Sequence, residues 1–441
     1  MSGMGEQRRQ QADDVNDASA AAMRESAREA ILQSNLTGGV ALGLDIGGAN
    51  LKAADSTGLA WTRPFALWRR PEAIADELAA LMRDRPHAAE GAVTFDRIAL
   101  TMTAELCDCF ATKRDGVNAV LDAVAAAFPE VTIMVWLTSG EWVTSAEARR
   151  RPLEAAASNW HAMATWVAAC WQEWGHEGAA DPSESVDAAG EPDAAAILID
   201  IGSTTTDVIP IGAGRVLAVG KTDTQRLASG ELVYVGGRRT ALMSLGPMIE
   251  FEGRSTRVMA EFFASSDDVM LVLGLIDEDG GDTDTADGRS RTKGFALARL
   301  LRMVGADGES SNPGAGEALA AAFLQRMAER IADAVKQVIS TQADSGRMIE
   351  TVIVSGSGRA IATEAMKVVD AALCASLPAA RRAAFSVARE AAISAAGIQQ
   401  GVRMRRETIE DVVGGGGHAL AVSAAAAAVV ALATEPRMQG A

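Results

Sequence analysis

The chain has 441 residues, more than one hydrophobic core usually supports, so two domains or one duplicated unit are expected. Hydrophobic residues make up 48% and charged residues 22%, which is typical of a globular protein and excludes a disordered chain. The formal net charge of −17 argues against nucleic acid and against an anionic membrane surface as partners, because both require a cationic face. An anionic small molecule must then be held by loop amides, helix N-termini, a metal ion or a few arginines.

The chain contains four cysteines, Cys107, Cys109, Cys170 and Cys374. They are too few to form a disulfide framework in a chain of this length, and they favour a reducing, cytoplasmic location. Residues 1–38 contain no apolar segment of the kind found in secretory signals and predict a disordered polar extension, and residues 435–441 predict a disordered tail. The longest apolar run, residues 419–433, is shorter than the roughly 20 residues that span a bilayer, so it predicts a buried helix.

The first half of the chain predicts strands and helices in alternation. Three strands are expected first, at residues 39–48, 50–58 and 59–68, and Pro71 then opens a helix that ends near residue 85. The remaining elements are a strand at 96–103, a helix at 117–128, a strand at 131–137 and a long helix at 145–174. This order indicates a first lobe over residues 39–174. The acidic residues 175–195, rich in Gly, Pro and Ser, predict a solvated linker loop between lobes.

The same opening recurs in the second half. Residues 194–203 repeat the apolar strand that ends in Asp-Ile-Gly, and strands at 204–212 and 214–220 are expected after it. Asp45 and Asp200 lie 155 residues apart in equivalent positions, which indicates duplication of one α/β unit. Helices are expected at 315–339 and 360–375, on either side of a buried strand and glycine loop at 350–358. The second lobe spans residues 196–434, and the chain predicts a duplicated, two-lobed α/β fold with a cleft between the lobes.

A polar loop follows the strand that ends at Asp45. Gly47 and Gly48 carry no side chains, so their backbone amides can approach a phosphate group closely. Asn50 and Lys52 add side-chain donors to the same loop. Taken alone, the pattern is also explained by a strand-ending turn that an aspartate caps.

The second copy has a matching loop, in which Gly202 follows Asp200 and the hydroxyls come from Ser203, Thr204 and Thr205. These hydroxyls and the loop amides are suited to a second phosphate across the cleft. Two facing carboxylates are the usual seat for Mg²⁺ between phosphate oxygens, so Asp45 and Asp200 are the candidate metal ligands. The duplication is what favours this hypothesis over two ordinary turns.

The two loops and the VSGSG segment at residues 354–358 resemble the phosphate-1, phosphate-2 and adenosine motifs of the actin-like superfamily. That superfamily contains actin, sugar kinases, acetate kinase and the chaperone ATPases. The resemblance spans residues 39–434. It implies an actin-like fold and places Gly356 and Gly358 among the ligand-binding residues.

Longer stretches between the loops resemble a single family, the hydantoinase/oxoprolinase-related proteins of the tetrahydromethanopterin-linked C1-transfer pathway. The matching stretches are residues 102–117, 155–162, 222–240, 260–274 and 282–307. Archaeal members include a methanofuran-biosynthesis synthase that joins an aminomethylfuran diphosphate to γ-glutamyltyramine. The resemblance implies a transferase that condenses a furanylmethyl diphosphate with the phenol of a tyramine- or tyrosine-glutamate acceptor and releases diphosphate. The resemblance implies small molecules as partners and Mg²⁺ as the cofactor. ATP, if it binds, is not expected to be turned over. The sequence does not decide whether the protein forms a homo-oligomer.

The resemblance also implies roles for individual residues. Glu105, Asp108 and Lys113 match the family pattern Glu-Leu-x-Asp-Cys-Phe-x-x-Lys and are candidate substrate-pocket residues. As the diphosphate leaves, the furan ring is expected to stabilise cationic character at its methylene carbon, which the phenol oxygen then attacks. Asp45, Asp108 or Asp200 is the candidate catalytic base for the phenolic proton, and the sequence does not choose among them.

Other polar groups have two interpretations each. Arg238 and Arg239 follow paired glycines and either clamp phosphate or the glutamate carboxylates of the acceptor, or lie in a solvated turn. The charged residues between Asp282 and Lys293 either bind a metal or close over substrate, or form a hydrophilic surface loop. Asn159 and Trp160 either form a core tryptophan beside a hydrogen-bonded asparagine, which is favoured slightly, or have a binding role. Zinc is not expected, because the histidines are scattered and no CxxC or HxxxH spacing is present.

Two further functions compete with the transferase. One is an ATP-dependent enzyme, either a small-molecule kinase or an oxoprolinase-like amidohydrolase, which the VSGSG segment favours. The other is a non-catalytic assembly protein that senses a nucleotide in the cleft. Release of ADP from ATP separates the first from the transferase, and rescue of a gene deletion by an Asp45→Ala, Asp200→Ala double variant identifies the second.

Overall fold

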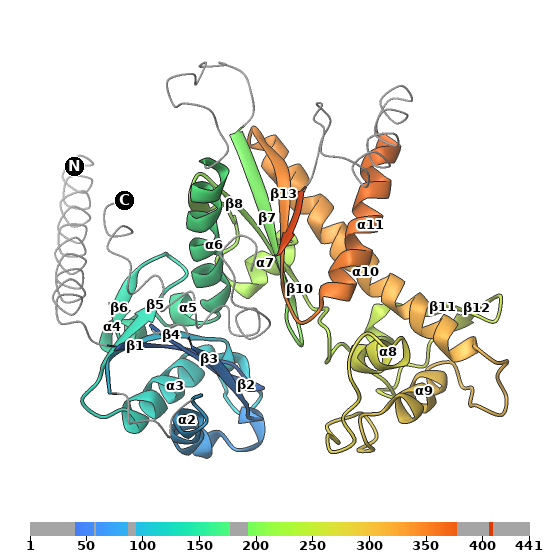
Figure 1. Cartoon of the computed structure of the whole chain (residues 1–441), viewed down its shortest axis with the longest axis horizontal. Helices are drawn as coiled ribbons and strands as arrows, with labels where there is room; N and C mark the ends of the chain where they lie inside the picture. The colour runs from blue at the N-terminus through green and yellow to red at the C-terminus, as the bar shows by residue number, and fades with distance from the viewer. Residues whose placement is uncertain (1–39, 57–58, 87–93, 177–192, 377–404, 409–441) are drawn as a thin grey trace, which may run out of the picture. The chain divides into compact units, whose positions relative to one another are not determined.

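The computed structural model describes residues 40–56, 59–86, 94–176, 193–376 and 405–408 (Figure 1). They form two compact units, one ending at Cys170 and the other beginning at Trp171. The expected N-terminal extension, C-terminal tail and helix at 419–433 lie outside the described residues. Most of the expected linker does too, although its first two residues continue a helix and residue 193 begins a strand.

The first unit is built on a six-stranded mixed sheet in the order β3-β2-β1-β4-β5-β6. Its strands are β1 (Val40–Ile46), β2 (Asn50–Asp55), β3 (Ala60–Pro64), β4 (Phe95–Met102), β5 (Thr132–Trp136) and β6 (Trp142–Thr144). β1 runs antiparallel to β2 and parallel to β4, and β4 runs parallel to β5. β1 is buried almost throughout, as expected for a central strand covered on both faces.

Helices cover the two faces of this sheet. They are α2 (Ile74–Arg83), α3 (Lys113–Ala127), α4 (Ser145–Arg150), α5 (Pro152–Ala155) and α6 (Asn159–His176), with single turns at η1 (Leu67–Arg69), η2 (Pro71–Ala73) and η4 (Ala104–Leu106). Residues of α2 and α3 pack with β1 and β4 into one core, while Ala162 and Trp166 of α6 pack with Ala99 and Trp136. Figure 1 shows α2 and α3 together on one side of the sheet.

Two expectations for these helices were wrong. The long helix at 145–174 is three helices, because Arg151 ends α4, Pro152 starts α5 at a position where no amide donor is needed, and Ala157 adopts a φ of 48°. The helix expected from residue 117 starts at Lys113, where the Thr112 side chain accepts a hydrogen bond from the Asp115 amide at 3.2 Å.

The second unit repeats the plan of the first in a sheet ordered β10-β8-β7-β13-β14. Its strands are β7 (Asp193–Ile201), β8 (Thr206–Gly212), β10 (Leu232–Val233), β13 (Arg347–Gly356) and β14 (Arg405–Thr408), and β9 (Arg215–Val216) pairs with β8 beside this path. As in the first unit, the first strand is antiparallel to the second and parallel to the fourth. In both units, therefore, neighbouring strands of the sheet follow the same order: third, second, first, fourth and fifth. The expected duplicated, actin-like α/β fold is confirmed.

The prediction of a third strand at residues 214–220 was wrong. Only Arg215 and Val216 pair with β8, and β10 occupies the third position after helix α7 (Asp223–Ser229). Thr222 starts α7 in a capping box with Gln225.

The remaining elements of the second unit lie between its strands. They are η6 (Leu242–Leu245), the hairpin β11 (Met248–Phe251) and β12 (Arg254–Arg257), α8 (Ser266–Val272), α9 (Lys293–Arg302), α10 (Ala315–Asp344) and α11 (Arg359–Ser376). Phe323 and Ile331 of α10 pack with strands and with α8, α9 and α11 in one core. No helix among the described residues has the length and apolar character needed to cross a bilayer.

Candidate functional site

The first loop is organised by the pairing of Asp45 with Lys52. The antiparallel register of β1 and β2 places the two residues opposite each other, and Lys52 Nζ donates to Asp45 Oδ2 at 3.0 Å. The Asp45 side chain is fully buried, and its other oxygen, Oδ1, makes no hydrogen bond within the described structure. A buried carboxylate with one open oxygen is costly unless a cation or donor completes it.

The turn after β1 depends on its two glycines. The Gly47 amide donates to the Asn50 carbonyl at 3.0 Å, and a Cβ added to Gly47 would lie 2.9 Å from that oxygen. A Cβ on Gly48 would lie 2.6 Å from Cys107 Sγ. The glycines therefore allow a close approach of backbone to the segment that carries Cys107.

The segment from Thr103 to Lys113 lies beside this loop. The Thr103 amide donates to the Ile46 carbonyl at 2.9 Å, which holds the end of β4 next to the end of β1. Glu105 is buried in the single turn η4, and Gly116 of α3 packs directly on its backbone. Of the other residues in this segment, Lys113 is half-buried and Asp108 is exposed. The structure thus brings the family-pattern residues to the edge of the first loop.

The second loop contacts the VSGSG segment. Asp200, at the end of β7, is half-buried, and the Gly202 amide donates to the Thr205 carbonyl at 2.9 Å, as Gly47 does to Asn50 in the first loop. Gly356 has a φ of 85°, and a Cβ there would collide with the Ile201 carbonyl and lie 2.9 Å from Asp200 Oδ1. The Gly358 amide donates to the same carbonyl at 3.1 Å. The structure therefore places Gly356 and Gly358 against the end of β7, next to Asp200 and Ile201.

The two arginines are fixed to the same loop through their backbone. The Arg238 and Arg239 amides both donate to the Ser203 carbonyl, at 3.0 and 2.8 Å, and the Gly237 amide donates to the Gly202 carbonyl at 2.9 Å. A Cβ on the preceding Gly236 would lie 2.5 Å from the Thr204 amide nitrogen. Arg238 is half-buried and Arg239 is exposed. Since the turn is attached to the second loop, it is not an independent solvated turn.

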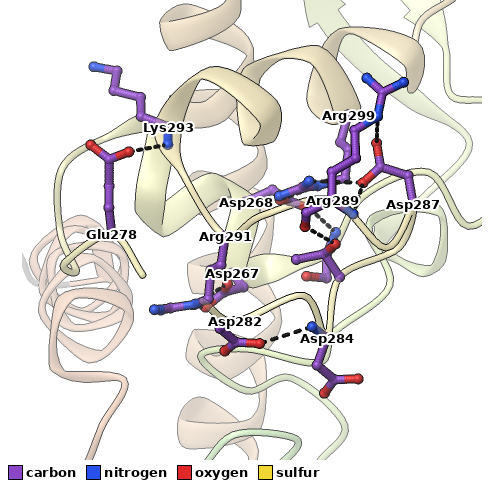
Figure 2. A network of polar contacts seen from close by, with 12 residues as sticks. Asp267, Asp268, Glu278, Asp282, Asp284, Asp287, Arg289, Arg291, Lys293 and Arg299 are labelled. Carbon is purple, nitrogen blue, oxygen red and sulfur yellow. Dashed lines mark hydrogen bonds and ion pairs between the residues drawn. The ribbon is translucent and has the colours of Figure 1, made fainter. Parts of the chain in front are cut away.

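Residues 277–293, here called the charged loop, form a network of ion pairs (Figure 2). Arg291 binds Asp267 of α8 through two bonds of 2.6 and 2.9 Å, and buried Arg299 of α9 binds Asp268 at 2.7 Å and Asp287 at 3.0 Å. These carboxylates are held by arginines, and the described residues contain no group of three or more His, Cys, Asp or Glu that could hold a metal ion. The network favours a structural role for the loop over metal binding.

Hydrogen bonds set the acidity of this network. Burial acts to raise the pKa of Asp282, but the Asp284 amide and the Arg238 guanidinium bind its charged form and bring that pKa below its ordinary value. Burial raises the pKa of Asp268, which lies deeper, even though Arg299 opposes this effect. At neutral pH the loop carboxylate of Asp282 is thus ionised and paired.

Asp45 and Asp200 are the carboxylates that the first and the second loop would each offer to a magnesium ion. Asp45 offers one buried, open oxygen, and Asp200 is accessible in part. The described residues contain no group of three metal-binding side chains, so an ion at either carboxylate would complete its coordination with water and phosphate oxygens, as Mg²⁺ commonly does.

Sequence reasoning missed several residues of the second loop. Asp207 lies opposite Asp200 in the β7–β8 register and pairs at 2.8 Å with Arg226, which is almost fully buried. The spacing offered a signal, because Asp207 follows Asp200 by as many residues as Lys52 follows Asp45. The pairing of Arg238 with Asp282 at 2.6 Å had no such signal, since the partners are far apart in sequence.

The remaining expectations concern the core. Trp160 is 2% exposed, which confirms its expected core position, and half-buried Asn159 is satisfied because its Oδ1 accepts a hydrogen bond from the Trp160 amide at 2.8 Å. The neighbouring His161 accepts a hydrogen bond from Trp136 Nε1 at 3.2 Å and is buried. The cysteines Cys107, Cys109 and Cys170 are each half-buried.

Comparison with known proteins identifies relatives. The family model for hydantoinase/oxoprolinase matches residues 96–388, more than half of the chain. The chain is 33% identical to the "(4-{4-[2-(gamma-L-glutamylamino)ethyl]phenoxymethyl}furan-2-yl)methanamine synthase" of Methanocaldococcus jannaschii, over 74% of this chain and 88% of that protein. It is 34% identical to the synthase of the same name from Methanococcus vannielii, over 38% of this chain and 74% of that protein.

Solved structures were compared as well. A ROK family glucokinase from Streptomyces griseus, in complex with glucose and AMPPNP, has 14% sequence identity and a TM-score of 0.39, covering 89% of this chain and 99% of its own. Nucleotide-free acetone carboxylase has 11% identity and a TM-score of 0.45, covering 75% of this chain and 67% of its own.

Proposed function

The chain belongs to the hydantoinase/oxoprolinase family, and from this premise we propose that it is a transferase that joins a furanylmethyl group to a phenol. The observation that carries the proposal is the 33% identity to the synthase from Methanocaldococcus jannaschii over 88% of that protein's length. The printed name of that synthase describes a phenoxymethyl ether between a glutamylaminoethyl phenol and an aminomethylfuran. The same ether is the product proposed here.

The reaction replaces one carbon–oxygen bond with another. The bond between the furanylmethyl carbon and the diphosphate oxygen breaks, and its electron pair leaves with diphosphate. The furan oxygen donates electron density to the methylene carbon as positive charge develops there. The phenol oxygen of the acceptor then bonds to that carbon, and a carboxylate takes the phenolic proton.

Each of the two loops carries groups suited to a phosphate of the leaving group. In the first, the Lys52 ammonium provides a donor beside Asp45, and the Gly47 amide is bonded to the Asn50 carbonyl within the turn. In the second, the hydroxyls of the Ser203–Thr205 segment lie where the VSGSG turn approaches Asp200. Donors fixed in place before the reaction stabilise charge that develops on a leaving group. Asp45 in the first loop and Asp200 in the second are each proposed as a ligand for Mg²⁺, which would neutralise part of the charge of a bound phosphate group.

The proton acceptor is proposed to be Asp108. Asp45 is fully buried and paired with Lys52, so it is less accessible to a substrate than Asp108. Asp108 is exposed and lies in the segment that packs against the first loop. An exposed carboxylate at this edge can reach a bound phenol, and Asp108→Asn is expected to lower kcat with little change in KM for the diphosphate.

A direct assay tests the function. Purified protein is incubated with an aminomethylfuranylmethyl diphosphate, γ-glutamyltyramine and Mg²⁺, and ether product and released diphosphate are measured by mass spectrometry. Equal amounts of both products are expected from the wild type, and almost none from the Asp45→Ala, Asp200→Ala double variant or after chelation of the metal. Steady ADP release from ATP without furan substrate would instead establish the ATP-dependent alternative, which the position of the VSGSG turn against Asp200 keeps open.

A further inference from the structure

Arg238 belongs to a closed ring of four residues that joins the second loop to the charged loop. Its guanidinium donates to Asp282 Oδ2 at 2.6 Å, and the Asp282 carbonyl accepts from the Arg291 amide at 2.8 Å. Arg291 binds the Asp267 carboxylate through two bonds, and the Asp267 amide donates to the Arg238 carbonyl at 3.3 Å. Each member is thus held by two others, which fixes the ring as one rigid piece.

The ring leaves part of the Arg238 side chain available. Only the Nη2 group of its guanidinium forms a side-chain hydrogen bond with the described residues, and the side chain is 36% exposed. A guanidinium has five N–H donors in a planar fork, so most of them remain open. The Arg238 amide is bound to the Ser203 carbonyl, which anchors these donors beside the second loop.

We infer that Asp282 is a positioning residue, which holds Arg238 so that its open donors bind the anion carried by the second loop. The inference rests on the proposed function and specifies the ligand as the diphosphate group of the substrate. Asp282 restricts the rotation of a long side chain, so less conformational freedom is lost when the anion binds. The charged loop therefore contributes to anion binding without touching the anion.

The test is calorimetric titration of the full-length protein with inorganic diphosphate in the presence of Mg²⁺. Arg238→Gln should weaken binding about tenfold or more, because a charge-assisted bond is lost. Asp282→Asn should weaken it about threefold to tenfold, and Asp282→Glu should restore part of the loss, since it keeps the charge. Asp284→Asn is the matched control. Asp284 is in the same loop, 4.0 Å from Arg238, and this change should leave affinity within about twofold.

Two further readouts separate positioning from loss of structure. Arg299→Met breaks a buried ion pair in the same network and should lower the melting temperature without weakening diphosphate binding. In the synthase assay, Asp282→Asn should raise KM for the furanylmethyl diphosphate and leave kcat nearly unchanged. If Asp282→Asn and Asp284→Asn bound diphosphate with equal affinity, the inference would be wrong. It would also be wrong if Arg299→Met weakened diphosphate binding as much as Asp282→Asn does. Either result would leave the proposed function unaffected. A wild type that does not bind diphosphate would overturn the proposed function with it.

Discussion

Asp45 and Asp200 occupy equivalent positions in the two units, but their neighbours give them different surroundings. Asp45 faces Lys52 across the β1–β2 pair, whereas Asp200 faces Asp207 across the β7–β8 pair. Asp207 in turn pairs with buried Arg226. In the first unit Lys52 of β2 balances the charge of Asp45. In the second unit Arg226 of helix α7 balances the charge of Asp207. Equivalent positions in a duplicated fold can therefore take different charges.

The Asp45–Lys52 pair predicts a stability effect. Lys52→Met leaves a fully buried carboxylate without its cation, and since Lys52 is itself 26% exposed we expect the free energy of unfolding to fall by about 2 kcal/mol. Replacing Asp45 by Asn in the same background should recover part of this loss. Lys336→Met, which breaks an exposed pair with Asp333, should cost less than about 0.5 kcal/mol. Urea denaturation measures all three, and equal losses at Lys52 and Lys336 would refute the prediction.

Two glycines with similar backbone angles provide a second prediction. Gly356 and Gly346 have φ values of 85° and 75°, but a Cβ at Gly356 would collide with the Ile201 carbonyl, while Gly346 has open space around it. Gly346→Ala should destabilise by about 1 kcal/mol from backbone strain alone. Gly356→Ala should cost about 3 kcal/mol or more, because β13 must move away from β7. Thermal unfolding of the two variants checks the difference, and similar melting temperatures would show that the contact is not restrictive.

At the scale of elements, local sequence patterns predicted most strands of the two sheets and most of the helices beside them. They did not predict helices α8 and α9, which flank the charged loop. α8 and α9 are short helices that bury apolar residues in the core of the second unit, and Arg299 also pairs there with Asp268 and Asp287. Those pairs join residues between 12 and 31 positions apart, which no periodicity records. Propensity and hydrophobic spacing detect helices that bury an apolar stripe, and they miss structure held by charges.

The charged loop should therefore be sensitive to acid. Burial acts to raise the pKa of Asp287, but the Arg289 amide and the Arg299 guanidinium lower it below its ordinary value. The pKa of Asp287 is thus lower in the folded state than in the unfolded state, where it is about 4. Its stabilising effect is fully present at pH values above the unfolded-state pKa and is lost as pH falls through the folded-state pKa. The stability difference between the wild type and Asp287→Asn should thus be constant from about pH 7 to pH 5 and shrink below about pH 4.

Denaturation curves of both proteins across this pH range measure that difference. In an Arg299→Met background the effect of Asp287→Asn should be smaller at neutral pH, since one of the two partners of the carboxylate is missing. A difference as large at pH 3 as at pH 7 would contradict a role for the ionised carboxylate.

At the scale of the whole molecule, each unit has its own hydrophobic core. Leu78 of α2 belongs to the first core and is fully buried, and Phe323 of α10 belongs to the second and is 1% exposed. Leu78→Ala and Phe323→Ala should each lower stability by about 3 kcal/mol, through lost burial and the cavity left behind. Hydrogen exchange should accelerate mainly in the unit that carries the substitution. Faster exchange throughout both units from either variant would show a single cooperative core.

The sequence by itself determined the duplicated α/β plan, the glycine turns after Asp45 and Asp200, and the family to which the chain belongs. These features depend on short segments, because the spacing of apolar residues and the backbone conformations open to glycine are both local properties of the sequence. Tertiary structure alone decided which charges meet, including Lys52 with Asp45, Arg226 with Asp207, and Asp282 with Arg238. An ion pair depends on distances of a few ångströms between side chains, and only the folded sheets and loops set those distances.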